Sequence, residues 1–275
     1  HYQNKNFLEA EGHFTQAIQQ QQDFADAYTN LGLCSIAVKD WNKALKNFKT
    51  AYTIDSSLEI DDYLAHTYEQ IQEWDNALHH YQKKCTYNPE HTTYHQMGTV
   101  LLQKEQPAAA AKAFEKALEI NPRFADSHHN IACIALIERN LSTALKHWMK
   151  VLEIEQSADS YYNIAVIYMY QDKFQDASSF FKETLKRDPK HFAAIFNLAG
   201  LNLKQQNYEW AKTFYQQALE LDPEHEECHY MLQALSASAD QTPEKKYTRA
   251  PKQHVQNLFN CYSDHYDQHL TDVLT

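Results

Sequence analysis

The sequence predicts an all-α protein, a right-handed α-solenoid (superhelix) built from stacked helix-turn-helix repeats. Two observations predict this fold. The 275 residues include only four Gly and seven Pro, which is too few for the turns of a sheet-rich fold. The chain also resembles itself at intervals of 33 to 34 residues, and such a period is typical of arrays in which one small helical unit stacks on the next.

One helix of each repeat is marked by a small residue, an aromatic residue four positions later and usually a second small residue three positions after that. Spacings of four and three place the trio on one helix face, where the small side chain lets a neighbouring helix approach and the ring fills the space beside it. Seven trios follow one another: Ala10/Phe14/Ala17, Ala44/Phe48/Ala51, Ala77/Tyr81/Lys84, Ala110/Phe114/Ala117, Ala144/Trp148/Val151, Ala177/Phe181/Thr184 and Ala211/Tyr215/Ala218.

The other helix of each hairpin is marked by an apolar residue followed by a small one. Short polar stretches such as Lys39-Asp40 and Gln205-Gln206-Asn207 join the two helices of a hairpin. Proline is tolerated in the first turn of a helix but not in its interior, so Pro89, Pro122, Pro189 and Pro223 indicate where one hairpin ends and the next begins. The pairs are Leu31-Gly32, Leu64-Ala65, Met97-Gly98, Ile131-Ala132, Ile164-Ala165 and Leu198-Ala199.

These trios, pairs and prolines resemble the tetratricopeptide repeat (TPR) family over roughly residues 1 to 235. The resemblance implies a protein-binding scaffold whose concave surface is lined by the first helix of each hairpin. Three trios end in Lys84, Val151 or Thr184 where the family has a small residue, and we expect looser packing there.

In chain order, we expect 1–24 to be the second helix of a partial first repeat and 25–223 to be six full repeats. Residues 224–238 read as a capping helix, with Met231, Leu232 and Leu235 facing the last repeat. Residues 239–251 lose the apolar periodicity and read as a linker, and 252–275 as the truncated helical start of a C-terminal domain.

Composition limits the partners. The formal charge of −11 and the absence of a Lys/Arg run argue against nucleic acid, and no apolar stretch is long enough to span a membrane. The five cysteines have no CxxC spacing, which favours a reducing, cytoplasmic location. We expect a monomer or a weak homo-oligomer, because the partial repeat at the N-terminus offers an exposed half-unit for self-association.

One position, just before the apolar–small pair, is expected to face the concave surface in every repeat. A side-chain amide there can pair with both the N–H and the C=O of an extended peptide. The spacing resembles the asparagine ladder of O-GlcNAc transferase and importin-type solenoids, although Asn at this position also serves inter-helix geometry in ordinary repeats. The position is held by Asn30, Tyr63, Gln96, Asn130, Asn163 and Asn197.

Acidic residues lie one turn earlier on the same helices, at Asp26, Glu59, Asp126 and Asp159. They would give the surface a negative wall that favours basic or donor-rich segments. An alternative is that they complement the helix macrodipole. The family's clamp for a terminal carboxylate needs Lys and Arg on these faces, and the sequence lacks them.

Sixteen histidines raise the question of a metal site. The pairs His91/His95, His225/His229 and His265/His269 have i, i+4 spacing, but two imidazoles do not complete a site and no HExxH glutamate accompanies them. We therefore predict no metal site.

The tail resembles the entry helices of bacterial proteins in which TPRs precede an S-adenosylmethionine-dependent methyltransferase domain. The matching positions include Pro251, Val255, Tyr262 and Tyr266-Asp267. This resemblance implies a substrate-recognition arm for a catalytic domain beyond residue 275; a second amphipathic helix that folds back on the array is the alternative. We expect no cofactor and no catalytic residue within 1–275, since the glycine-rich turn that would hold the methyl donor is absent. The leading prediction is a scaffold that binds an extended polypeptide or protein partner.

Overall fold

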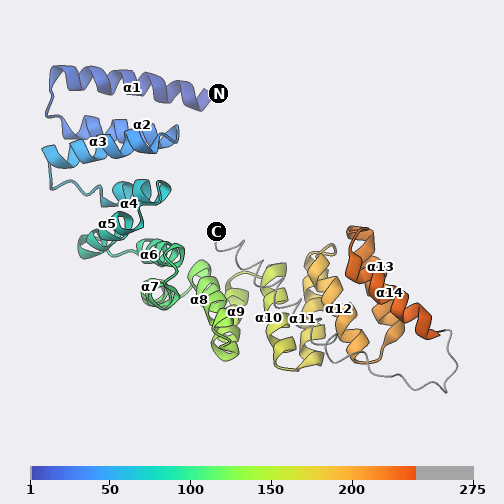
Figure 1. The fold of residues 1–275 in the computed structure, drawn as a ribbon. Helices are drawn as coiled ribbons and strands as arrows, with labels where there is room; N and C mark the ends of the chain where they lie inside the picture. The colour runs from blue at the N-terminus through green and yellow to red at the C-terminus, as the bar shows by residue number, and fades with distance from the viewer. Residues whose placement is uncertain (1, 240–275) are drawn as a thin grey trace. The chain divides into compact units, whose positions relative to one another are not determined.

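A computed structural model describes residues 2–239, and the regular structure within that range is entirely α-helical (Figure 1). The predicted linker from residue 240 onward and the predicted start of a C-terminal domain lie outside the described residues. The fourteen described helices are α1 (Tyr2–Gln20), α2 (Ala25–Ala37), α3 (Trp41–Ile54), α4 (Asp61–Gln70), α5 (Trp74–Tyr87), α6 (His91–Gln103), α7 (Pro107–Ile120), α8 (Ala125–Ile137), α9 (Leu141–Ile154), α10 (Ala158–Tyr170), α11 (Phe174–Arg187), α12 (Phe192–Lys204), α13 (Tyr208–Leu221) and α14 (Glu226–Ala239).

The helices pack pairwise as stacked helix-turn-helix repeats, as the sequence predicts. The chain divides into an N-terminal unit, residues 1–127, and a C-terminal unit, residues 128–275. In the N-terminal unit α2 pairs with α3, α4 with α5 and α6 with α7. In the C-terminal unit α10 pairs with α11 and α12 with α13, and α14 packs against α13. We call the even-numbered helices first helices and the odd-numbered ones second helices.

The turn inside each hairpin is a Schellman motif without glycine. At the end of α2, Asp40 N donates to Ser35 O and Lys39 N to Ile36 O, both at 2.9 Å, and Lys39 has φ of 60°. The same pattern closes α12, where Gln206 has φ of 63°. Left-handed backbone is costly for a residue with a Cβ atom, so a repeated strain is built into the array. Among residues 2–239, those with positive φ are Lys39, Gln72, Glu105, Arg139, Asp172 and Gln206.

The aromatic residue is buried in the six trios from Ala44 onward and half-buried at Phe14, and in a full hairpin its ring fixes how closely the two helices approach. Phe48 and Phe114 are fully buried, at 0% exposure. They lie so close to Gly32 and Gly98 that a Cβ atom on either glycine would be 2.4 Å from the ring. Glycine is therefore a steric requirement in these two repeats.

The expected looser packing at the three departing trios is not found. Val151 and Thr184 are 1% and 0% exposed, as buried as the alanines of the other trios. Lys84 is 9% exposed, and its Nζ lies 3.0 Å from Asp62 Oδ1 and 3.1 Å from Glu90 Oε2. Burial alone would lower the pKa of Lys84, but its bonds to the two carboxylates raise it. In this repeat, the ion pairs of Lys84 with Asp62 and Glu90 take the place of the close packing that a small residue provides in other repeats.

The last described helix, α14, covers the final hairpin. Cys228 and Met231 are buried, and Leu232 and Leu235 pack against the same apolar cluster of α12 and α13. The role of residues 224–238 as a cap stays a prediction. None of the described helices is both long and apolar enough to cross a membrane.

Candidate protein-binding face

The first helices carry the residues that the sequence nominates for binding, and in the N-terminal unit these are partly or fully exposed. Asn30 is partly buried and its Nδ2 donates to Asp26 O at 2.9 Å, within α2. Gln96 on α6 is also partly buried. Tyr63 is 39% exposed and stacks on Phe48, with ring centroids 5.7 Å apart. Asn30 therefore directs one amide donor into its own helix.

In the C-terminal unit the amides are more enclosed than an open ladder would be. Asn130 on α8 is partly buried, whereas Asn163 and Asn197 are 7% and 3% exposed. Asn163 Nδ2 donates to Asp159 O at 2.8 Å, as Asn30 does in its own helix. Asn197 Nδ2 reaches across to the Tyr162 hydroxyl on α10 at 3.3 Å, and its buried Oδ1 has no hydrogen-bond partner. Asn197 is thus a buried acceptor between two first helices.

The nominated acids are exposed. Asp26 and Asp126 lie in the first turns of α2 and α8, and the Asp159 side chain in the first turn of α10 is 80% exposed. Asp159 Oδ1 is 3.7 Å from His191 Nε2. Both interpretations from the sequence, a negative wall and complementation of the macrodipole, fit this placement.

Histidines cap two first helices, which the sequence analysis missed. His191 Nδ1 accepts from Ala194 N at 3.2 Å, and His225 Nδ1 accepts from Cys228 N at 3.3 Å. Each ring also lies on an aromatic residue of the preceding first helix: His191 is 4.7 Å from Tyr162 and His225 is 5.3 Å from Phe196. A histidine just before an apolar first helix is the signal that could have revealed these junctions.

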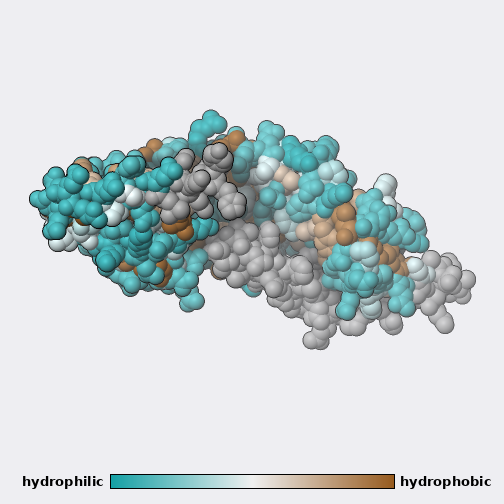
Figure 2. All heavy atoms as spheres, turned by 90° about the horizontal axis from the view of Figure 1, so that it is seen from above, coloured by the Kyte–Doolittle hydropathy of each residue, from teal (hydrophilic) through white to brown (hydrophobic). Residues whose placement is uncertain are grey.

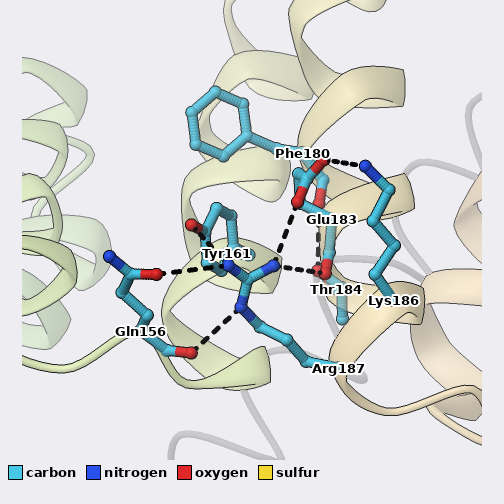
Figure 3. Close-up of polar contacts among 7 residues, drawn as sticks. All are labelled: Gln156, Tyr161, Phe180, Glu183, Thr184, Lys186 and Arg187. Atoms are coloured by element: carbon cyan, nitrogen blue, oxygen red, sulfur yellow. Dashed lines mark hydrogen bonds and ion pairs between the residues drawn. The ribbon is translucent and has the colours of Figure 1, made fainter.

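Arg187 fastens the hairpin of α10 and α11 to the loop before it (Figure 3). Its guanidinium lies over the Tyr161 ring at 3.8 Å and donates to the Tyr161 hydroxyl at 2.8 Å. It also donates to Glu183 Oε2 at 3.0 Å and to the carbonyl oxygen of Gln156 at 3.0 Å. These bonds occupy the donors with which Arg187 would bind an external carboxylate, so its role is structural.

A second polar cluster, also missed, surrounds Asp61 at the start of α4. Asp61 is 1% exposed and lies 2.7 Å from His80 Nδ1, 3.3 Å from Lys83 Nζ and 3.3 Å from the Tyr87 hydroxyl. Burial lowers the pKa of His80, although Asp61 opposes this shift. Three donors satisfy the one carboxylate, so the cluster binds α4 to α5.

Histidines elsewhere pack on rings. His91 and His95 lie 4.8 Å and 5.0 Å from the Phe124 ring. Within residues 2–239, no group of three or more His, Cys, Asp or Glu side chains is arranged to hold a metal ion.

Comparison with known proteins agrees with this fold of stacked helical hairpins. Models of the tetratricopeptide repeat match residues 92–124, 113–146 and 168–235. Over these residues the chain carries tetratricopeptide repeats. Superkiller protein 3 of Schizosaccharomyces pombe (strain 972 / ATCC 24843) is 27% identical over 133 residues, which are 44% of this chain and 9% of that protein. The chain therefore matches only a small part of this relative.

Solved structures share the fold. YrrB, described as a TPR protein with an unusual peptide-binding site, is 24% identical with a TM-score of 0.56, covering 66% of this chain and 95% of YrrB. PilF of Pseudomonas aeruginosa is 16% identical with a TM-score of 0.56, covering 78% and 97% of the two chains. MamA of Desulfovibrio magneticus RS-1 is 15% identical with a TM-score of 0.55, covering 61% and 96%. Sequence identities this low show a shared fold and nothing more specific.

Proposed function

We propose that the chain is a protein-interaction scaffold that binds an extended polypeptide along its first helices. The observation that carries the proposal is the recurrence of a side-chain amide at one register position, on five of the first helices. Its members are Asn30, Gln96, Asn130, Asn163 and Asn197. An amide offers both a donor and an acceptor to a peptide backbone without reading its side chains.

Each such hydrogen bond contributes only about 0.5–1.5 kcal/mol, so several must act together for useful affinity. Asn30 and Asn163 each direct one donor into their own helix, which fixes the orientation of the amide. Figure 2 shows hydrophilic residues over much of the coloured surface, with hydrophobic patches among them. YrrB, with its peptide-binding site, offers a precedent within the same fold.

Selection from a random library of peptides of about 12 residues, long enough to cross several repeats in extended form, tests this proposal. The change Asn130→Ala with Asn163→Ala should weaken a selected peptide by about 5- to 150-fold, the equivalent of two lost hydrogen bonds. Asn202→Ala is the matched control, because Asn202 Nδ2 donates to Leu198 O at 2.8 Å, the same local bond that Asn163 makes. Unchanged affinity in the double variant would remove the backbone-grip idea.

We also keep the substrate-recognition arm of an S-adenosylmethionine-dependent methyltransferase as a second hypothesis. It rests on the tail residues Val255, Tyr262 and Tyr266, which lie outside the described range, and the matched families and relatives do not support it. Calorimetric titration of the parent protein with S-adenosylmethionine is the test, and absence of binding would dismiss it.

The cytoplasmic location stays a prediction from cysteine spacing. Cys34, Cys85, Cys133 and Cys228 are free thiols, which supports a reducing compartment.

A further inference from the structure

Charge is divided unevenly between the two kinds of helix. The seven first helices from α2 to α14 carry eight Asp or Glu residues and a single Lys or Arg, which is Lys204. The six second helices from α3 to α13 carry thirteen Lys or Arg residues and eight Asp or Glu residues. The first helices are therefore acidic. Five of their eight acids lie in the N-terminal unit, and the first helices of the C-terminal unit carry Asp159, Glu226 and Glu227 against Lys204.

The single base on the first helices is directed towards a second helix. Lys204 ends α12, its Nζ lies 3.5 Å from Asp172 Oδ1, and it lies 3.9 Å from the centre of the Phe174 ring. Asp172 is in the turn before α11 and Phe174 begins α11. Lys204 thus does little to offset the acids of the first helices.

In the C-terminal unit one contiguous set of side chains joins α10 to α12. Asp159 faces His191 at 3.7 Å, the His191 ring lies 4.7 Å from the Tyr162 ring, and the Tyr162 hydroxyl accepts from Asn197 Nδ2. Asn197 is 3% exposed and its Oδ1 is an acceptor without a donor. A buried acceptor without a donor is destabilising, and a donor supplied by a ligand would relieve that cost. This observation is independent of the surface charge, and it also selects a ligand rich in N–H donors.

We propose that the first-helix face of the C-terminal unit binds an extended polypeptide segment rich in Lys or Arg, with Asp159 and Glu227 attracting its charge and Asn197 Oδ1 accepting one of its N–H groups. This inference rests on the proposed polypeptide binding and names the chemistry of the partner. Lys presents three donors and Arg five, with no acceptor, which suits a face that offers carboxylates and an unpaired carbonyl. Acidic segments are repelled by the same face.

The peptide selection described above tests both statements separately. Enrichment of basic peptides, with affinity that falls several-fold between about 50 mM and 300 mM NaCl, supports the inference. Enrichment of neutral or acidic peptides overturns it and leaves polypeptide binding intact. Failure to enrich any peptide overturns both.

A pair of double variants locates the interaction. Asp159→Asn with Glu227→Gln removes first-turn acids from α10 and α14, whereas Asp176→Asn with Glu209→Gln removes first-turn acids from the second helices α11 and α13. Both variants change the net charge and the helix dipoles equally. The first should weaken a selected basic peptide at least about threefold and the second should not, in line with the strength of exposed charge pairs. Equal effects would show attraction by overall charge and would overturn the assignment of the face.

The buried acceptor has its own measurement. Asn197→Leu should weaken the basic peptide, and the loss should persist at high salt because it removes a hydrogen bond and not a charge. Thermal unfolding of the same variant shows whether the fold is intact. A folded Asn197→Leu protein that binds as tightly as the parent would remove Asn197 from the site.

Discussion

Gly98 is the position at which the structure makes its sharpest prediction about packing. Replacing it with alanine places a Cβ atom 2.4 Å from Cε1 of Phe114, and 2.7 Å from Cδ1 and Cζ of the same ring. Real Cβ contacts are never this short, so the ring or the helix must move. Phe114 is 0% exposed and enclosed by the repeat, which leaves the ring little room to do so.

The magnitude follows from two opposing effects. Overpacking of a well-filled core typically costs about 1–3 kcal/mol. Replacing a glycine inside a helix with alanine stabilises the helix by about 1 kcal/mol. Gly98→Ala should therefore lower the free energy of unfolding by up to about 2 kcal/mol. Gly12→Ala is the matched control, because Gly12 lies inside α1 with no atom within 4 Å of the added Cβ, and it should raise stability by up to about 1 kcal/mol.

Urea unfolding followed by circular dichroism measures both variants, and their difference isolates the steric effect. Combining Gly98→Ala with Phe114→Leu should be less destabilising than the sum of the single changes, because the smaller side chain relieves the contact. If Gly98→Ala proves as stabilising as Gly12→Ala, the reasoning is wrong and the Phe114 ring can move away from the added Cβ atom. Ala165 and Phe181 hold the corresponding positions in another repeat, where a ring and a Cβ atom are accommodated together.

Three further predictions concern polar groups and turns. The Tyr81 hydroxyl donates to Glu69 Oε2 at 2.8 Å, whereas the Tyr215 hydroxyl at the same register is buried without a partner. Tyr81→Phe should lower the melting temperature by the equivalent of about 1 kcal/mol. Tyr215→Phe should leave the melting temperature unchanged or raise it by up to the equivalent of about 1 kcal/mol. Burial, with His128 nearby, lowers the pKa of His147 to about 4, below the value near 6.5 of an unfolded histidine. The unfolded state therefore takes up the proton first, and stability is lost as pH falls from 6.5 to 4, by less than the full shift implies because the half-buried ring is partly screened by solvent. Denaturation across this range should show a smaller loss for His128→Tyr with His147→Phe, and an equal loss would contradict the assignment. Gln206→Gly should stabilise by about 0.5–1 kcal/mol because Gln206 has φ of 63°, whereas Gln205→Gly at φ of −84° should destabilise; the opposite order in thermal unfolding would refute the strain argument.

Much of the fold could be predicted because every repeat needs the same packing of a small residue beside an aromatic ring. A small residue followed by a ring four positions later is a direct imprint of helix approach, so the order of helices follows from the trios and pairs. Lys84 could not be understood in this way, because its carboxylate partners Asp62 and Glu90 lie on other elements. The turns were located from polar residues, but their left-handed backbone was not, since Lys39 and Gln206 carry no glycine signal.

The candidate binding residues were predicted by register, and their environment was not. Asn163 and Asn197 occupy the same register, yet one amide bonds within its own helix and the other reaches a neighbouring helix. Which of the two occurs depends on the rotamer and on whether a hydroxyl such as that of Tyr162 is near. A sequence repeat predicts where a side chain lies on its helix. It does not predict which groups of other helices that side chain will contact.

Another pair of positions shows how much freedom the fold leaves to chemistry. Residues 19 positions apart meet between the two helices of a hairpin as the acid and base Asp61 and His80, and as the imidazoles His128 and His147. In the repeat of α10 and α11 the same positions hold the rings of Tyr161 and Phe180. Packing demands contact there, but it does not demand a particular charge.

The same reasoning applies to the acidic first helices. First-turn acids also occur on second helices, at Asp75, Asp176 and Glu209, so the helix dipole favours them on both kinds of helix. What separates the two kinds is the near absence of Lys and Arg from the first helices. The first helices α2 to α12 expose few positions, so packing accounts for part of this scarcity. A basic partner along the first helices is a second cause, and the charge-matched variants test it.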